Sequence, residues 1–182
     1  MRQNETHQDA QAITPQASIM SPMYKIGVLT SSDMGARGER EDTSGELIKE
    51  LLALPDYEHT RYSVVPDERA IIEQTLTTWA DDDDLDLIMT TGGTGLTDRD
   101  VMPEATRAVV ERLAPGLAEA MRAFGLTKTP MAMLSRGIAG VRGRTLIINL
   151  PGSPKGVREG IEVLLPVLGH ALGQLTGENR GH

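Results

Sequence analysis

The stretch TLIINLPGSPKG, residues 145–156, combines a buried strand with an abrupt polar stop. Its first six residues are apolar on both faces, which is typical of a central strand in a parallel sheet, because helices cover such a strand above and below. Pro151 and Gly152 then end the strand, and helical spacing of apolar residues begins at about Lys155. The stretch therefore predicts a central strand, a short loop and a long helix.

Strands and helices alternate along the rest of the chain. Strands are expected at three earlier apolar runs and at one run beside the central strand: Tyr24–Thr30, Arg61–Val65, Leu85–Thr90 and Met131–Ser135. Helices are expected at about Ser44–Leu52, Asp67–Asp81, Val101–Leu113, Leu117–Phe124 and Lys155–Leu175, the last kinked by Pro166. This alternation implies an α/β fold, three-layered and doubly wound, with a mostly parallel sheet and helices on both faces.

Length and composition suit one globular domain, because 182 residues with 39% apolar content can bury a sizeable core. Residues 1–22 are polar and aperiodic, so we expect a flexible N-terminal tail, a domain over residues 23–178 and a short tail over residues 179–182. The start of the chain does not resemble a signal peptide, and no apolar run reaches bilayer length. We therefore expect a cytoplasmic protein that does not associate with membranes.

Charge and cysteine content narrow the chemistry. The net charge of −8 argues against general nucleic-acid binding, and the absence of cysteine excludes disulfides, thiolate metal sites and a cysteine nucleophile. A bound metal would therefore be a hard, oxygen-liganded cation. Between Glu119 and Glu159 the chain has no acidic residue but several basic ones, which favours an anionic small-molecule ligand: Arg122, Lys128, Arg136, Arg142, Arg144, Lys155 and Arg158.

Three loops follow predicted parallel strands, and ligands bind at the carboxyl ends of strands in doubly wound folds. They are residues 31–42, 91–100 and 151–156. The second reads TGGTGLTDRD and can cradle a phosphate, because glycine N–H groups and threonine hydroxyls converge there: Thr91, Gly92, Gly93, Thr94 and Gly95. The spacing matches neither a Walker loop nor a dinucleotide fingerprint, and a tight strand-to-helix turn is the structural alternative.

Further hydrogen-bond donors lie in the segment LSRG, residues 134–137, and around the third loop. Lys155 is a mobile positive charge beside backbone N–H groups at the start of a helix, which suits a phosphate. The candidate binding side chains are Ser135, Arg136, Asn149, Ser153 and Lys155. A plain proline–glycine stop between strand and helix is the alternative for the third loop.

Asp67 and Asp100 each precede a predicted helix. By position alone, helix capping is the simpler interpretation, worth about 1 kcal/mol for each residue. The functional alternative is that two carboxylates at one edge of the sheet hold a magnesium ion that bridges nucleotide phosphates. The adjacent acids Asp81–Asp84 lack the ligand spacing of a calcium loop and are interpreted as a solvated helix end.

Four segments, taken in order, resemble the molybdopterin adenylyltransferase family, which includes the G domain of gephyrin. The most specific is TTGGTG followed by RDVMPEAT, and the others are VVPDERAIIEQTL, the pair LSRG and NLPGSPK, and the closing LLPVLGHAL. The resemblance extends from about Tyr24 to Gly177. One departure is Asp98, where many relatives have proline or arginine, so an acid is added beside the expected site.

The resemblance implies a trimer in which molybdopterin lies across the glycine-rich loop with ATP beside it. It implies that Asp67 and Asp100 are catalytic and hold Mg²⁺. It places pterin and phosphate contacts on Thr91–Gly95, on Ser135 and Arg136, and on the loop that contains Asn149, Pro151, Gly152, Ser153 and Lys155. It places the nucleotide near the first loop, at Ser32, Asp33, Asp42, Ser44 and Gly45.

The expected activity is a step of molybdenum cofactor biosynthesis, the Mg²⁺- and ATP-dependent adenylylation of molybdopterin with release of pyrophosphate. A molybdenum insertase is the expected transient partner. The alternative within the family is a carrier that binds molybdopterin without catalysis, or a trimeric scaffold. A pyrophosphate-release assay separates these possibilities.

Overall fold

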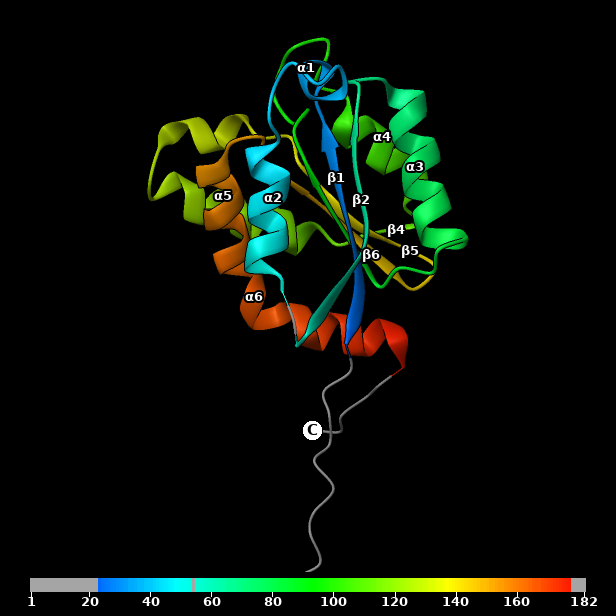
Figure 1. The fold of residues 1–182 in the computed structure, drawn as a ribbon. Helices are drawn as coiled ribbons and strands as arrows, with labels where there is room; N and C mark the ends of the chain where they lie inside the picture. Colours follow the sequence, from blue (N-terminus) through cyan, green and yellow to red (C-terminus); the bar gives the residue numbers. More distant parts are fainter. Residues whose placement is uncertain (1–22, 54, 178–182) are drawn as a thin grey trace, which may run out of the picture.

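The computed structural model describes residues 23–53 and 55–177, so the two predicted tails lie outside the described residues (Figure 1). Its centre is a six-stranded sheet in the order β2-β1-β3-β6-β5-β4. The strands are β1 Tyr24–Ser31, β2 Tyr57–Val65, β3 Leu87–Thr91, β4 Arg112–Leu113, β5 Ala139–Arg142 and β6 Thr145–Leu150. The first four strands in the sheet order are parallel, and β5 and β4 extend the sheet in antiparallel fashion.

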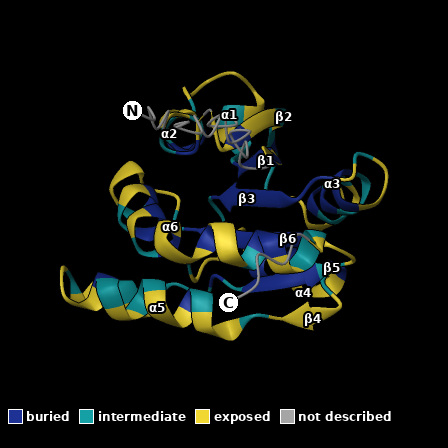
Figure 2. Cartoon of the chain, turned by 90° about the horizontal axis from the view of Figure 1, so that it is seen from below, coloured by how far each residue is buried: buried dark blue, intermediate teal, exposed yellow. Residues whose placement is uncertain are grey.

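Helices cover both faces of this sheet (Figures 1 and 2). They are α1 Asp33–Ala36, α2 Thr43–Leu51, α3 Arg69–Asp81, α4 Met102–Val109, α5 Pro115–Leu126, the 3₁₀-helix η1 Pro130–Leu134 and α6 Pro154–Thr176. On one face α2, α5 and α6 pack against alternate strand residues such as Met89 and Ile148. On the other face α3 and α4 pack against Ile88 and Ile147. The predicted three-layer, doubly wound α/β fold is thus confirmed.

The predicted strand at Met131–Ser135 is wrong, because these residues belong to η1 and the turn that follows it. The apolar run of this segment is too short to distinguish a strand from a helical turn. Pro130 favours the helical start, and the Thr129 hydroxyl accepts a bond from the Met131 N–H. The strand beside β6 is instead β5, which begins only at Ala139.

The predicted helix Val101–Leu113 is too long, because α4 ends at Val109. Arg112 and Leu113 leave the helix to pair with β5 as a short edge strand, so tertiary pairing overrides local helix preference. The predicted bend of the last helix, which contains Pro166, agrees with the structure. Figure 1 shows α6 bending partway along its length, as expected for a helix that contains a proline.

The parallel strands end at the same level, and this aligns the loops that follow them. Thr30 of β1 pairs with Thr91 of β3, and Thr91 pairs in turn with Leu150 of β6. The segments after these three residues therefore start side by side at the upper edge of the sheet in Figure 1. Among the described residues, no helix has the length and apolar character needed to span a bilayer.

Candidate active site

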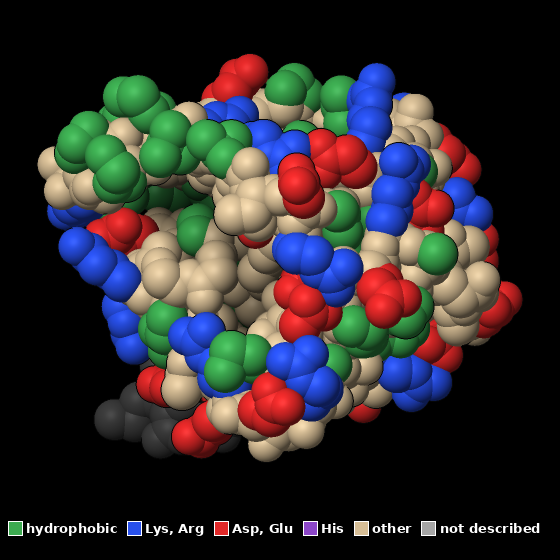
Figure 3. Space-filling view, turned by 90° about the horizontal axis from the view of Figure 1, so that it is seen from above, with side chains coloured by type: hydrophobic (Ala, Val, Ile, Leu, Met, Phe, Trp, Pro, Cys, Tyr) green, Lys and Arg blue, Asp and Glu red, His purple; other side chains and the backbone are tan. Residues whose placement is uncertain are grey.

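Two cavities flank the loop that follows β6. The larger, about 230 Å³, lies among α5, η1 and the start of α6, and the smaller, about 170 Å³, lies between the end of β1 and the start of α2. Pro151 lines the larger cavity and Gly152 the smaller, so these two residues form the wall between them. The Thr91 hydroxyl donates to the Pro151 carbonyl at 2.7 Å, and the Ser44 hydroxyl donates to the Gly152 carbonyl at 2.9 Å. Figure 3 shows this hollowed edge from above.

The larger cavity combines an apolar lining with a cationic rim. Its apolar side chains include Ala118, Met121, Met131 and Ala132, and its polar ones include Arg122, Ser135, Ser153 and Lys155. Arg122 donates from Nη1 to the Gly137 carbonyl at 2.8 Å, and Ser153 caps α6 by accepting from the Gly156 N–H at 3.1 Å. Lys155 is mostly exposed and lies 3.9 Å from Glu159. Such a cavity suits a flat ring that carries an anionic group.

Only part of the basic segment noted in the sequence contributes to this cavity. Arg122 and Lys155 line it. Arg142 and Arg144 lie at the opposite edge of the sheet, where they form ion pairs with Asp81, Asp84 and Asp86. The uneven charge in the sequence is therefore shared between a cavity and a set of stabilising ion pairs.

The smaller cavity is lined by hydroxyls from Thr30, Ser31, Ser32 and Ser44. Asp42 closes one side and caps α2, since its Oδ1 accepts from the Gly45 N–H at 2.9 Å. The Asp42 Oδ2 accepts from Thr30 at 2.5 Å and from the Tyr62 hydroxyl at 2.8 Å. The pKa of the Tyr62 hydroxyl is raised, mainly by partial burial of the hydroxyl and secondly by its bond to the Asp42 carboxylate. A polar cavity at a helix start suits the phosphates of a nucleotide.

The glycine-rich loop takes conformations that other residues rarely adopt. Gly92 and Gly93 have φ values of +88° and +62°, and a Cβ at Gly92 would collide with the Ser31 carbonyl oxygen. A Cβ at Gly95 would lie 2.8 Å from the Asp100 carboxylate. Thr94 is buried, and its carbonyl accepts the Arg136 N–H at 3.0 Å. The glycines therefore allow the loop to lie against both β1 and Asp100.

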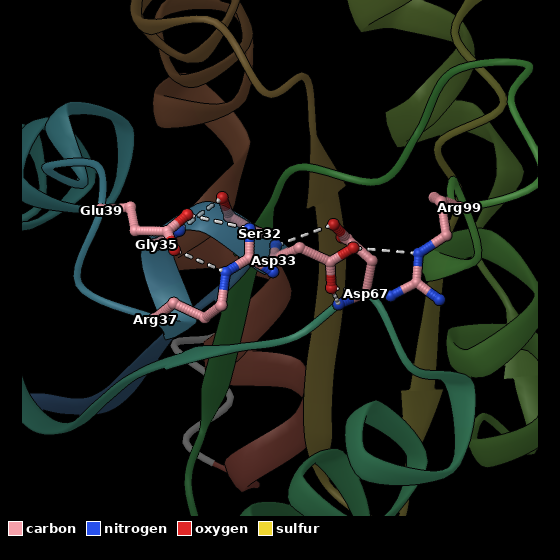
Figure 4. Close-up of polar contacts among 7 residues, drawn as sticks. All are labelled: Ser32, Asp33, Gly35, Arg37, Glu39, Asp67 and Arg99. Atoms are coloured by element: carbon pink, nitrogen blue, oxygen red, sulfur yellow. Dashed lines mark hydrogen bonds and ion pairs between the residues drawn. The ribbon is translucent and has the colours of Figure 1, made fainter.

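Asp67 faces the end of β1. Its Oδ1 accepts from the Ser31 hydroxyl at 2.6 Å. Its Oδ2 accepts from the Asp33 N–H at 3.0 Å, a bond drawn in Figure 4. The Ser31 Oγ in turn lies 3.6 Å from the position that a Cβ at Gly93 would occupy. The predicted helix cap is wrong, since the N-cap of α3 is Glu68, which makes no side-chain cap bond.

Asp100 holds its own loop together. Its Oδ2 accepts from the Thr97 N–H at 2.8 Å and from the Thr97 hydroxyl at 2.6 Å. Burial by itself would raise the pKa of the Asp100 carboxyl, but the bonds from Thr97 and from the Gly95 N–H outweigh burial and lower that pKa. Capping of α4 is wrong here too, because the N-cap is Val101.

Arg136 and Asn149 were both predicted to bind ligand, but their polar groups form hydrogen bonds with other residues of the protein. Arg136 donates to the Gly95 carbonyl at 2.6 Å and also bonds the Asp100 carbonyl and Glu104. Asn149 is buried; it donates to the hydroxyls of Thr90 at 3.0 Å and Thr106 at 2.9 Å, and it accepts from the Ile138 N–H. Both side chains thus position the strand ends and the glycine-rich loop.

Sequence reasoning missed two contributors to the site, Ser31 and Arg99, and it identified the hydroxyl of Thr97 but not its partner. Ser31 and Thr97 supply the hydroxyls that hold the two acids, and Arg99 forms an ion pair with Asp33. Each lies in a loop that was already selected by its place after a strand. Their hydroxyl and guanidinium groups identify them in the sequence as possible hydrogen-bond donors, but only the fold shows which residue each one contacts.

The two acids suit a hard cation. Within the described residues neither Asp67 nor Asp100 forms an ion pair, and both are held by hydroxyl and N–H donors, which leave the negative charge in place. Magnesium takes oxygen ligands and is commonly held by one or two carboxylates together with substrate phosphates. No group of three or more His, Cys, Asp or Glu that could hold a metal occurs in the described part of the chain, so substrate oxygens would complete the coordination. Each of the two carboxylates by itself therefore fits as one oxygen ligand of Mg²⁺ that arrives with a nucleotide.

Comparison with known proteins matches residues 27–170 to the family model described as "Probable molybdopterin binding domain". The chain belongs to this molybdopterin-binding family. It is 44% identical, over 154 residues, to a molybdopterin adenylyltransferase of Helicobacter pylori strain J99, an alignment that covers 84% of this chain and 88% of the relative. It is 45% identical to gephyrin of Dictyostelium discoideum over 84% of this chain and 23% of that protein.

Solved structures of the molybdopterin-binding family have the same fold. The molybdopterin biosynthesis enzyme MoaB of Thermus thermophilus is 60% identical, covers 85% of this chain and 98% of its own, and superposes with a TM-score of 0.81. The family resemblance expected from the sequence motifs is thus confirmed, as is the α/β class of the fold.

Proposed function

We propose that this chain is a molybdopterin adenylyltransferase of molybdenum cofactor biosynthesis, which uses Mg²⁺ and ATP to adenylylate molybdopterin and releases pyrophosphate. One observation carries the proposal: Asp67 and Asp100, which form no ion pair among the described residues, are held by hydroxyls at the end of β1 and in the glycine-rich loop, and Ser31 and Gly92 of these segments line the smaller cavity. Relatives that cover most of the chain and carry this enzyme name support it.

The two substrates would occupy the two cavities. The larger, with apolar side chains and the cations Arg122 and Lys155, suits the pterin and its phosphate. The smaller, with its hydroxyls and the start of α2, suits the nucleotide. Both cavities reach the wall formed by Pro151 and Gly152, so the reacting phosphates would meet there, beside the glycine-rich loop.

The proposed chemistry is an in-line attack by the terminal phosphate of molybdopterin on the α-phosphorus of ATP, with pyrophosphate as the leaving group. A phosphate monoester is already anionic at neutral pH, so no strong general base is required. Asp67 and Asp100 would hold the magnesium ion, which supplies charge neutralisation at the transferring phosphoryl group. Lys155 and the N–H groups of the glycine-rich loop would offset the repulsion between the two anions.

The same proposal includes a homotrimer, a cytoplasmic location and transient contact with a molybdenum insertase. Exposed apolar side chains on α5 and η1 offer a surface for association: Leu126, Met131, Met133 and Leu134. Figure 3 shows hydrophobic side chains gathered beside the hollow at this edge of the molecule. The oligomeric state is measured by light scattering of the purified chain.

The test is a reconstituted reaction of the chain with molybdopterin, ATP and Mg²⁺. We expect release of pyrophosphate and formation of adenylyl-molybdopterin, identified by mass spectrometry, and loss of both when Mg²⁺ is chelated. The variant Asp67→Asn is expected to bind molybdopterin as the wild type does but to release pyrophosphate about 1,000-fold more slowly, a rate that single-turnover measurements still detect. Binding of molybdopterin by the wild type without any pyrophosphate release would favour the non-catalytic carrier.

A further inference from the structure

We infer that Asp33 and Arg99 form a positioning pair that fixes the carboxylate of Asp67 and ties it to the loop that carries Asp100. The inference rests on the proposed function, because it concerns how the two acids of that site are aligned. Asp33, Arg99, Asp67 and Asp100 all lie outside the two cavity linings, and we assign the pair a role that acts through Asp67 because Asp33 is hydrogen-bonded to Asp67.

Asp33 and Asp67 exchange hydrogen bonds in both directions. The Asp33 N–H donates to the Asp67 Oδ2 at 3.0 Å, and the Asp67 N–H donates to the Asp33 Oδ1 at 3.0 Å. Two such bonds fix each carboxylate relative to the backbone of the other segment. With the Ser31 hydroxyl on the second oxygen of Asp67, that carboxylate has little freedom to rotate.

Arg99 connects this arrangement to the glycine-rich loop. Its Nε and Nη2 donate to the two oxygens of Asp33 at 3.0 Å and 2.7 Å, in a bidentate ion pair (Figure 4). Arg99 directly precedes Asp100, whose carboxylate holds the same loop through Thr97. One arginine thus joins the segment after β1, the segment after β2 and the segment after β3.

The pair also separates the charges of neighbouring acids. Asp33 and Asp67 are joined by hydrogen bonds, and two neighbouring carboxylates without ion pairs repel each other and compete for one cation. Arg99 neutralises Asp33 and, as the largest influence on it, lowers the pKa of its carboxyl. Among the described residues Asp67 is the acid of the two that forms no ion pair, and therefore the one available to a metal ion.

A second ion pair in the same segment provides a matched control. Arg37 donates to both oxygens of Glu39 at 3.0 Å and 2.9 Å, and both side chains are exposed (Figure 4). Its geometry matches that of the Arg99–Asp33 pair, but no bond joins it to Asp67. Removal of Arg37 therefore tests the loss of a surface ion pair without loss of positioning.

The experiment compares Arg99→Gln, Arg99→Lys and Arg37→Gln in the full chain. We expect Arg99→Gln to lower kcat about 10- to 100-fold, the range for loss of a group that orients a metal ligand, with the KM for molybdopterin within about twofold of the wild type. Arg99→Lys should recover part of the loss, because it restores the charge but not the bidentate geometry. Arg37→Gln should behave as the wild type.

A second measurement tests whether the pair acts through Asp67. In an Asp67→Asn background, adding Arg99→Gln should cause no further fall in the single-turnover rate. Binding of Mn²⁺ in the presence of a non-reactive ATP analogue, followed by electron paramagnetic resonance, should weaken about tenfold in Arg99→Gln and stay unchanged in Arg37→Gln. Circular dichroism melting verifies that each variant is folded.

Two results would overturn the inference. One is a further loss of the same size when Arg99→Gln is added to Asp67→Asn, since Arg99 would then act on substrate directly. The other is unchanged Mn²⁺ binding in both Arg99 variants. Failure of the proposed function has a different signature: the wild type would release no pyrophosphate, while the Mn²⁺ measurements would still report on the positioning pair.

Discussion

The acids at the two ends of the parallel strands differ in the groups that hold them. Before β3, at the amino end, four acids from the last residue of α3 onward form ion pairs with arginines of distant segments: Asp81 with Arg142, Asp83 with Arg61, and Asp84 and Asp86 with Arg144. After β2 and β3, at the carboxyl end, Asp67 and Asp100 are held by hydroxyl and N–H groups instead. The same residue type is thus placed in two different electrostatic settings.

The difference shows how to separate structural acids from functional ones. An aspartate that shares a guanidinium has its charge compensated by the protein, so it contributes local stability or, as proposed for Asp33, positions a neighbouring acid. An aspartate fixed by neutral donors is held in place while its charge stays available to a cation. By this criterion the acidic run Asp81–Asp84, although more conspicuous in the sequence, is the structural set.

The largest effect on turnover is expected from a change at the carboxyl end of the parallel strands. Asp100→Asn should lower AMP transfer about 1,000-fold, equivalent to about 4 kcal/mol, because the amide keeps an acceptor for Thr97 but loses the charge that holds Mg²⁺. Molybdopterin binding, measured by calorimetry, should be largely retained. Asp83→Asn is the matched change at the other end and should leave turnover within about twofold of the wild type. Equal effects of the two variants would remove the distinction drawn between the ends.

The second prediction concerns a polar group at the carboxyl end that is structural. Asn149→Ala should lower the free energy of unfolding by about 3 kcal/mol, because it leaves Thr90, Thr106 and the Ile138 N–H without their partner in a buried place. Urea denaturation measures the change. Gln74→Ala, which removes an exposed side-chain bond to Thr78, is the control and should cost less than about 0.5 kcal/mol. A small effect of Asn149→Ala would instead indicate that the side chain is free for ligand.

The third prediction uses the pKa of Asp100. Thr97→Val removes the hydroxyl that lowers this pKa, so the pKa should rise, as measured by NMR titration of the carboxyl group. A lowered pKa in the folded state stabilises the protein above the ordinary pKa of aspartate and loses that effect as the pH falls. The difference in Tm between wild type and variant should therefore be full at pH 6 and shrink as the pH falls below about 4. A difference that grew on acidification would contradict this assignment.

The smallest effect is expected at the amino end. Arg142→Gln removes a bidentate ion pair with Asp81 that is partly open to solvent, so it should lower the free energy of unfolding by about 0.5–1 kcal/mol. Added salt should reduce the difference between variant and wild type, because it screens the pair that the variant lacks. AMP transfer should be unchanged. A fall in turnover that exceeds the loss of folded protein would assign this end a part in the reaction.

Periodicity predicted the strands of the core and the loops that follow them, since apolar runs such as residues 145–150 are long and bounded by clear stops. It failed at Met131–Ser135, where a short apolar run is compatible with either a strand or a helical turn. Position before a helix favoured capping for Asp67 and Asp100, and this interpretation failed because position does not reveal which direction a side chain takes. The sequence therefore identified the loops that form the site but not the contacts that their side chains make.

The sequence by itself determined that this protein has a parallel sheet, a glycine-rich loop at one edge and acids in the adjoining loops, because each of these depends on local chemistry. Only the tertiary structure decided that Arg99 reaches Asp33, 66 positions away in the chain, and that its ion pair is with Asp33 rather than with Asp67. Pairings of this kind depend on the register of β1, β3 and β6, which places distant loops at one level. Register is a property of the whole sheet, and no single segment contains it.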